Sequence, residues 1–154
     1  MGVEAESLAG LEFKPHIGLS MVPGMLAVAS VIDGQEKLDL LGEVATIIDS
    51  YIATLRSPQY LKALNAIDYP LLDAFELLEA IGVEGLEEVL SYAERAIEGR
   101  AGSPPDIVEV YADLLGWNTS PKELEPEILG YAILISFTAS FNKALNNIAS
   151  GEAS

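Results

Sequence analysis

The side chains best suited to chemistry in this sequence are a single histidine and a set of carboxylates. His16 lies in the stretch FKPHIGL and could act as a general base, but that role needs an orienting partner and a substrate pocket. The sequence around it offers neither, so we interpret His16 as a surface or packing residue. Carboxylate pairs, such as Glu87 with Glu88 and Glu76 with Glu79, fall where solvated helix faces are expected.

Several other chemistries are excluded by residue content. The chain has no cysteine, which removes thiol nucleophiles, thiolate metal sites and thiol redox reactions together. A ferritin-like di-metal site needs Glu-x-x-His on two helices, and one histidine cannot provide that. Calcium loops, glycine-rich nucleotide loops and the Gly-x-Ser-x-Gly elbow are missing too. We therefore assign no catalytic, cofactor-binding or metal-ligating residue, and we expect no cofactor.

The charge balance favours a protein partner over nucleic acid or a membrane. The 24 acidic residues against 8 Lys and Arg give a net charge of −16, which repels phosphate backbones and anionic lipid. Such a charge suits a partner with a basic surface, or it is simply a solvated acidic shell. The opening MGVEAESLAGLEF lacks the basic and apolar regions of a signal peptide. We expect a soluble cytoplasmic protein that binds neither nucleic acid nor membrane.

Helical periodicity predicts an all-α fold, with one domain over residues 1–154 and six or seven helices in a bundle. Within EKLDLLGEVATIIDSYIATLR, apolar residues recur every three or four positions and so share one helical face. These residues are Leu38, Leu41, Ala45, Ile48, Ile52 and Leu55. No stretch alternates for long and no Asn-Gly or Asp-Gly turn occurs, so strands are not expected. Residues 1–15 are expected to form a flexible or extended segment.

Capping residues and glycines predict where the helices begin and end. A short apolar helix is expected from about Pro23 to near Gly34, and the last helix from Ser120 to about Ala149. The predicted N-caps are Ser57, Asp68 and Ser120, and the predicted stops are Gly82 and Gly116. Trp117 follows one of these stops, where it is either a partner contact or a packed cap.

Two uncharged runs, residues 15–32 and 128–142, raise the question of membrane insertion. A spanning helix needs about 20 apolar residues, but the second run is shorter and the first is interrupted by Pro23 and Gly24. Beyond residue 134 the second run divides into an apolar stripe and a polar stripe, which is typical of a helix that leaves a core and becomes half-exposed. The polar stripe consists of Ser136, Ser140, Lys143 and Asn147. We predict that the second run fills the core and that neither run crosses a membrane.

Residues 90–152 resemble the C-terminal half of AhpD-like proteins, the carboxymuconolactone decarboxylase superfamily. The pieces that carry the resemblance are YAERAI, LLGWNTSPKELEPEIL and SFTASFNKALNNIAS, with Asn142-Lys143 where the family has Asn-Arg. The resemblance implies an AhpD-like helical fold. The family's redox chemistry uses a Cys-x-x-Cys motif, which is absent here, so that activity is not carried over.

A second similarity, of MVPGMLAVASVIDG and IIDSYIATLRSPQYLKAL, is to DehI-type haloacid dehalogenases, which hydrolyse with an Asp-activated water. It makes Asp49 or Asp68 a candidate for that role, and no motif chooses between them. Two functional classes therefore stay open. The first is a non-enzymatic interaction or oligomeric accessory protein that binds itself or a basic partner. The alternative is a cysteine-free AhpD-like protein that binds or hydrolyses a small molecule.

Overall fold

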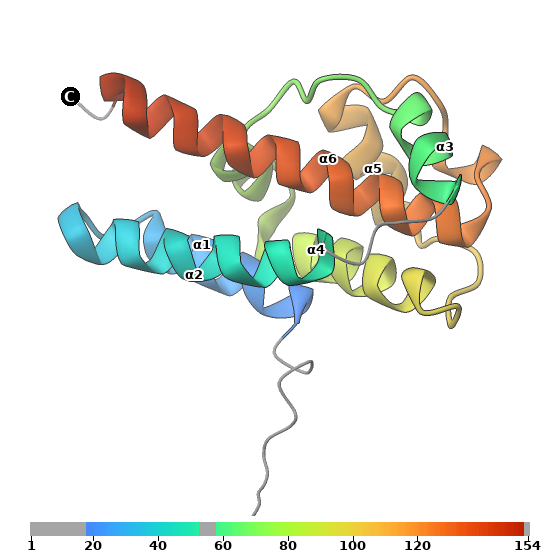
Figure 1. The fold of residues 1–154 in the computed structure, drawn as a ribbon, viewed down its shortest axis with the longest axis horizontal. Coiled ribbons are helices and arrows are strands. Elements are labelled where there is room, and N and C mark those ends of the chain that lie inside the picture. Colours follow the sequence, from blue (N-terminus) through green and yellow to red (C-terminus); the bar gives the residue numbers. More distant parts are fainter. Residues whose placement is uncertain (1–17, 53–57, 153–154) are drawn as a thin grey trace, which may run out of the picture.

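Six α-helices form the fold in the computed structural model, which describes residues 18–52 and 58–152 (Figure 1). In chain order they are α1 (Val22–Ala29), α2 (Gly34–Ile52), α3 (Pro58–Ala66), α4 (Ala74–Ile97), α5 (Asp106–Leu115) and α6 (Pro126–Asn147). The described ranges contain no strand, so the predicted all-α fold is confirmed. Residues 1–15, predicted to be flexible or extended, lie outside the described part of the chain.

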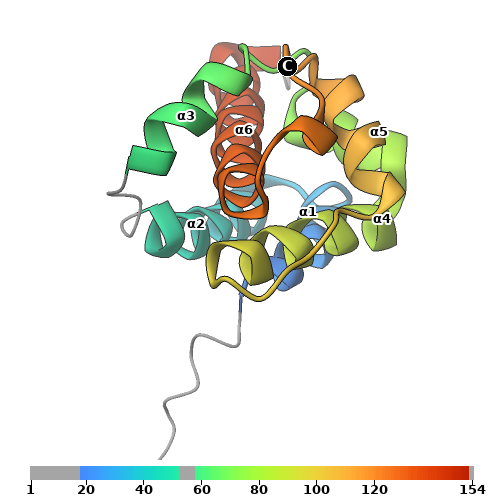
Figure 2. The ribbon, with the colours of Figure 1, turned by 90° about the vertical axis from the view of Figure 1, so that its right-hand side faces the viewer.

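Helix α6 packs mainly against α4 and α3. Seen end-on, α3 and α5 lie at its two sides and α2, α1 and α4 lie below it (Figure 2). Every residue from Ile128 to Leu134 is buried, which confirms the prediction that this run fills the core. Pro126–Ser150 has a mean hydropathy of 1.4 and is long enough to cross a membrane, but 67% of that window is buried by the rest of the fold.

The first half of the polar stripe of α6 is buried where we had expected it to become exposed, whereas Lys143 is half-buried and Asn147 is exposed, as predicted. Ser136 and Ser140 are 1% and 0% exposed. The hydroxyls of Ser136 and Tyr111 lie 3.0 Å apart, and the Ser140 hydroxyl donates to the Leu72 carbonyl at 2.7 Å. Helix α5 and the segment before α4 thus cover this side of α6, and their polar groups satisfy the two serines.

Helix α4 begins at Asp73, so the predicted N-cap at Asp68 is wrong. The Asp73 carboxylate accepts from the Glu76 backbone N–H, and the Glu76 carboxylate accepts from the Asp73 N–H, each at 2.9 Å. The second oxygen of Asp73 accepts from Asn147 Nδ2 at 3.0 Å, near the end of α6. Hydrogen bonds to α5 and α6 hold residues 71 and 72 outside a helix, and this delays the start of α4.

The last helix also begins later than predicted. Ser120 accepts from the Lys122 N–H at 3.3 Å, but it caps only a short 3-10 helix, η3 (Pro121–Glu123). The backbone is extended at Leu124, and α6 then starts at Pro126. Ser57 lies outside the described residues, while Pro58 is the first residue of α3, as expected.

Gly82 and Gly116 interrupt the helices where predicted. Gly116 has the left-handed conformation (φ 78°, ψ 36°) that ends α5. Gly82 also has a positive φ of 81°, but with a ψ of 164° that divides α4 into two helical segments. The first helix stops at Ala29, earlier than expected, and Gly34 instead begins α2.

Candidate functional site

The residues that sequence reasoning proposed for chemistry are not brought together. Asp49 is exposed on α2, and Asp68 is exposed in the loop after α3, where it accepts a hydrogen bond from Asn118 at 3.1 Å. His16 lies outside the described residues. Within residues 18–52 and 58–152, no group of three or more His, Cys, Asp or Glu is placed to hold a metal ion.

The carboxylate pairs also separate into different roles. Glu76 completes the cap of α4, whereas Glu79 and Glu88 are exposed. Glu87 is half-buried and lines a hollow on the molecular surface. Glu79 lines a separate hollow with Ser30, Phe75 and Leu78, whereas the hollow at Glu87 adjoins the apolar groove described below.

Three tyrosines have shifted titrations, each mainly because of burial. Burial raises the pKa of Tyr111, while its hydrogen bond with Ser136 acts in the opposite direction. Burial also raises the pKa of Tyr51, and the hydrogen bond from its hydroxyl to Glu94 at 2.7 Å adds to the effect. Tyr92, which donates to the Gly102 carbonyl, has a pKa raised by burial as well. These groups stay protonated and act as structural donors rather than as bases.

Trp117 forms a packed helix cap, one of the two roles predicted for it. Its ring meets the Tyr111 ring edge-on, with centroids 6.1 Å apart and planes at 84°. Its backbone N–H donates to the Ala112 carbonyl, just past the turn at Gly116. The indole side chain is half-buried and contributes to the core.

The strongest candidate site is instead built on α1, a helix without a charged side chain. No residue from Gly18 to Ile32 carries a charge, and Pro23 suits the first turn because its missing N–H would have no partner there. One side of α1 is buried through Val22 and Leu26. A neighbouring side leaves the N-cap residue Met21 48% exposed and Val28 52% exposed.

Helix α2 turns this exposed side into a groove. Its Leu40 and Ile47 are half-buried beside Met25 of α1 and beside Met21, the N-cap residue of α1. The groove between the two helices has a volume of about 500 Å³. It is lined by Met21, Met25, Leu40, Glu43, Thr46 and Ile47.

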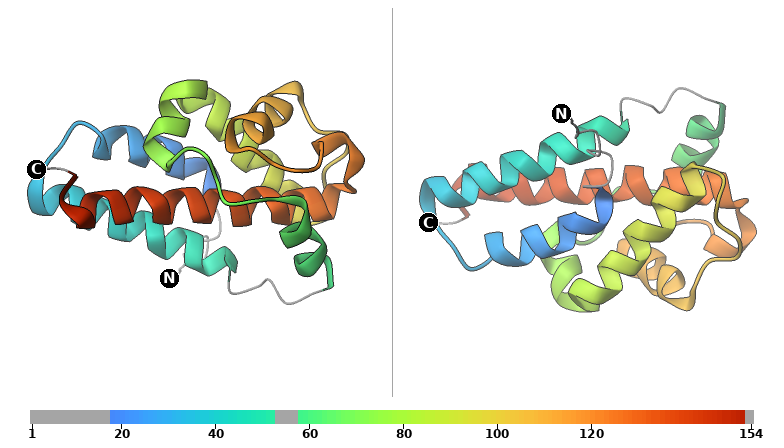
Figure 3. Two further views of the ribbon diagram at one scale, coloured as in Figure 1. Left: turned by 90° about the horizontal axis from the view of Figure 1, so that it is seen from above. Right: turned by 90° about the horizontal axis from the view of Figure 1, so that it is seen from below.

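A second hollow, of about 310 Å³, extends the groove across α1 toward α4. It shares Met21, Met25 and Leu40 with the groove and adds Val28 and Glu87. Seen from below, α2, α1 and α4 lie in front of α6 (Figure 3). We call this surface the α1 face: Met21, Met25, Val28, Leu40 and Ile47, with Glu43 of α2 and Glu87 of α4 as its acidic edges.

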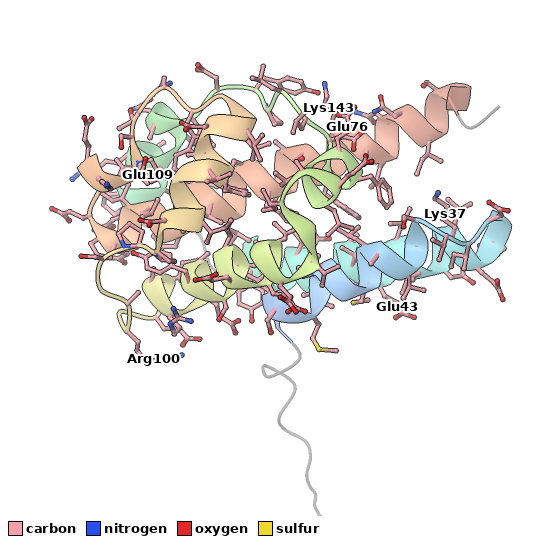
Figure 4. The ribbon with its side chains drawn as sticks, turned by 180° about the vertical axis from the view of Figure 1, so that it is seen from behind. Lys37, Glu43, Glu76, Arg100, Glu109 and Lys143 are labelled. Atoms are coloured by element: carbon pink, nitrogen blue, oxygen red, sulfur yellow. The ribbon has the colours of Figure 1, made fainter. Side chains whose placement is uncertain are left out.

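The basic residue of α2 lies away from the α1 face. Lys37 and Glu43 point to opposite sides of the α1–α2 pair (Figure 4). The Lys37 ammonium instead sits 5.3 Å from the centre of the Phe75 ring of α4. Among the described residues that line the α1 face, none is Lys or Arg. The face is therefore an apolar surface with negative edges.

Sequence reasoning missed this site, although a signal was present. The uncharged run of residues 15–32 was interpreted as containing a short apolar helix that does not cross a membrane, and no exposed side was predicted for it. A helix as short as α1, with no polar side to turn to water, must either be enclosed or leave apolar side chains exposed. The structure shows the second outcome.

Comparisons with known proteins supply no relative. No protein-family model matches the chain, and no curated protein or solved structure matches it significantly. The AhpD-like resemblance gains no support from them and stays a prediction.

Proposed function

We propose that this chain is a non-enzymatic interaction protein that binds another protein, one with a basic surface, through the α1 face. The observation that carries the proposal is the exposure of Met21 and Val28 on a helix without charge, beside an apolar groove. Contiguous exposed apolar surface with polar edges marks interaction sites in soluble proteins.

Charge supports a different protein as the partner over a second copy of this chain. The net charge is −16, and a second copy would bring the same acidic edges, Glu43 and Glu87, to the interface. Like charges placed against each other disfavour association, whereas a basic surface gains from both edges.

Small-molecule binding is the competing function. The groove volume of about 500 Å³ falls within the range of ligand pockets. Ligand sites also contain a few converging polar groups, and here Glu43 and Thr46 are the polar residues of the lining. Neither Asp49 nor Asp68 belongs to it, so the groove offers no support for the proposed hydrolysis.

Site-specific photo-cross-linking in cells that produce the protein tests the proposal. A photoreactive amino acid replaces Val28 of the α1 face or, as a matched control, Val110 of α5; the two valines are 52% and 45% exposed. We expect a discrete adduct with a basic protein from position 28 and not from position 110. Identical adducts at both positions, or none at position 28, would overturn the proposal. An adduct between two copies of this chain would overturn the choice of a different protein as partner.

A further inference from the structure

We infer that the α1 face binds an amphipathic helix of the partner protein. Lys or Arg residues flank the apolar side of this helix along both of its edges. The inference rests on the proposed function, since it specifies the partner element that the same surface binds. It depends on three properties of the face: its shape, its composition and the placement of its charges.

The shape of the face matches a helix. Met21 is the N-cap of α1 and has helical backbone angles, so Met21, Met25 and Val28, at spacings of four and three residues, form a stripe along the helix. The groove beside this stripe is bounded on its other side by Leu40 and Ile47 of α2. A partner helix that lies in such a groove uses apolar anchors at i, i+3, i+4 and i+7.

The composition of the face suits side chains of varied shape. Two of its residues, Met21 and Met25, are unbranched and flexible, and methionine-rich surfaces adapt to different apolar partners. The remaining apolar members are aliphatic, so leucine, isoleucine or phenylalanine anchors would meet hydrocarbon on each side.

The two glutamates at the edges of the face determine which charge the partner helix should carry. Glu43 belongs to α2 and Glu87 to α4, and α1 packs against both of these helices, so the two carboxylates flank the stripe. The described lining residues provide no basic group to neutralise them. A helix with cations on both sides of its anchors would pair with each edge, and the overall negative charge would accelerate its approach.

The same negative charges disfavour two other ligands for an apolar surface, a second copy of this chain and an anionic membrane. A second copy of this chain carries no charge from Gly18 to Ile32, the stretch that contains its own α1, and would add only further acidic edges. An anionic membrane would be repelled by the net charge of −16.

The inference is tested with the full chain and a fluorescent Leu/Lys peptide of about 18 residues, long enough to form an amphipathic helix. Fluorescence anisotropy measures the affinity. One control peptide contains D-residues that prevent helix formation, and another replaces Lys with Glu. We expect the parent peptide to bind at least about tenfold more tightly than either control.

Matched variants of the protein locate the binding surface. Val28→Lys should weaken binding of the parent peptide by about tenfold, while Val110→Lys, with the same charge change at similar exposure, should alter it by less than about twofold. Replacing Glu43 and Glu87 with Gln should weaken it by about fivefold, more than the same change at the exposed Glu123 and Glu127. Far-UV circular dichroism verifies that each variant is folded.

Four outcomes would overturn the inference. Equal losses in Val28→Lys and Val110→Lys would mean diffuse attraction to an acidic protein. Equal binding of the non-helical peptide would exclude a helix as the preferred element. A dimer in sedimentation analysis that Val28→Lys abolishes and that blocks the peptide would identify a second copy as the occupant. Binding of phosphatidylcholine vesicles that Val28→Lys abolishes, with no peptide binding, would identify a membrane.

Failure of this inference can be told apart from failure of the proposed function. A specific cross-link from position 28 to a basic protein, together with no preference for the helical peptide, would retain the interaction function and reject only the helix. No specific cross-link at all would reject the proposed function itself, whatever the peptide does.

Discussion

The two uncharged runs of this chain have similar compositions and opposite surroundings. In residues 128–142, α6 is covered by α4, by α3 and, at Ser136, by Tyr111 of α5. In residues 18–32, α1 is covered on one side only, and Met21 and Val28 remain about half exposed. The difference shows that apolar content alone does not determine burial. Where the fold leaves such a run open, the open side is the natural place for a partner.

The largest expected contrast comes from truncating one apolar side chain in each run. Phe137→Ala should lower the free energy of unfolding by about 3–5 kcal/mol, because Phe137 is fully buried and its loss leaves a cavity. Met21→Ala, at a side chain that is 48% exposed, should change it by less than about 0.5 kcal/mol. Urea denaturation measures both values, and comparable losses would show that α1 is as essential to the core as α6.

Adding a methyl group at a glycine of each run should give effects of opposite sign. A Cβ on Gly130 would lie 2.9 Å from Ala96 Cβ and 3.0 Å from the Ala93 carbonyl, so Gly130→Ala should destabilise by about 1–3 kcal/mol. A Cβ on Gly24 would meet nothing within 4 Å, so Gly24→Ala should stabilise α1 by about 0.5–1 kcal/mol. Thermal denaturation of the two variants should therefore shift in opposite directions; shifts of the same sign would contradict the close contact of α4 with α6.

A smaller contrast is expected between one serine of each run. Ser140→Ala removes the 2.7 Å hydrogen bond to the Leu72 carbonyl and should cost about 1 kcal/mol, because the bond is shielded from water. Ser30→Ala removes a bond of the same length to the Ala27 carbonyl, but at an exposed site, and should change stability by less than about 0.5 kcal/mol. Chemical denaturation distinguishes them. If Ser30→Ala had the larger effect, the assignment of covered and open sides would be wrong.

The smallest expected effect is a change in the free energy of unfolding at alkaline pH. It involves Tyr111, whose hydroxyl lies beside Ser136 of the covered helix α6. Burial holds the pKa of Tyr111 above its ordinary value, whereas in the unfolded chain the phenol ionises near pH 10. Below about pH 10 both states keep the proton; above it the unfolded state binds fewer protons, so stability falls as pH rises. Tyr111→Phe should make this fall shallower, with Tyr51 and Tyr92 still contributing. Unfolding free energies measured on either side of about pH 10 test this; an unchanged slope would contradict it.

The sequence was sufficient to predict the class of fold and several boundaries. Helical spacing and the missing turn signals gave the all-α bundle, and Gly82 and Gly116 interrupt helices as their positions indicated. The sequence did not predict helix boundaries that depend on tertiary hydrogen bonds. Asp68 and Asp73 are equally good caps by residue type, and only contacts from α5 and α6 to the intervening segment select Asp73.

Helical periodicity also failed to predict which apolar side chains of α2 and α1 are exposed, because exposure too depends on tertiary contacts. Leu38 was placed on the apolar face of α2, yet it is 50% exposed, and the buried residues are Leu41, Val44 and Ile48. In α1 every position is uncharged, so no polar side indicates which direction faces water. The α1 face therefore depends on how α2 and α4 lie beside α1, and this becomes visible only in the folded structure.

The most direct test of the central claim is a methyl NMR titration of the full chain with the helical Leu/Lys peptide. Met21 and Met25 lie on the α1 face, whereas Ala96 of α4 and Ala132 of α6 are buried in the core. We expect the two methionine methyl signals to shift with saturation while the two alanine signals stay in place. Methionine signals that do not move, or shifts of equal size at the methionines and the buried alanines, would contradict the claim that the α1 face is a binding surface.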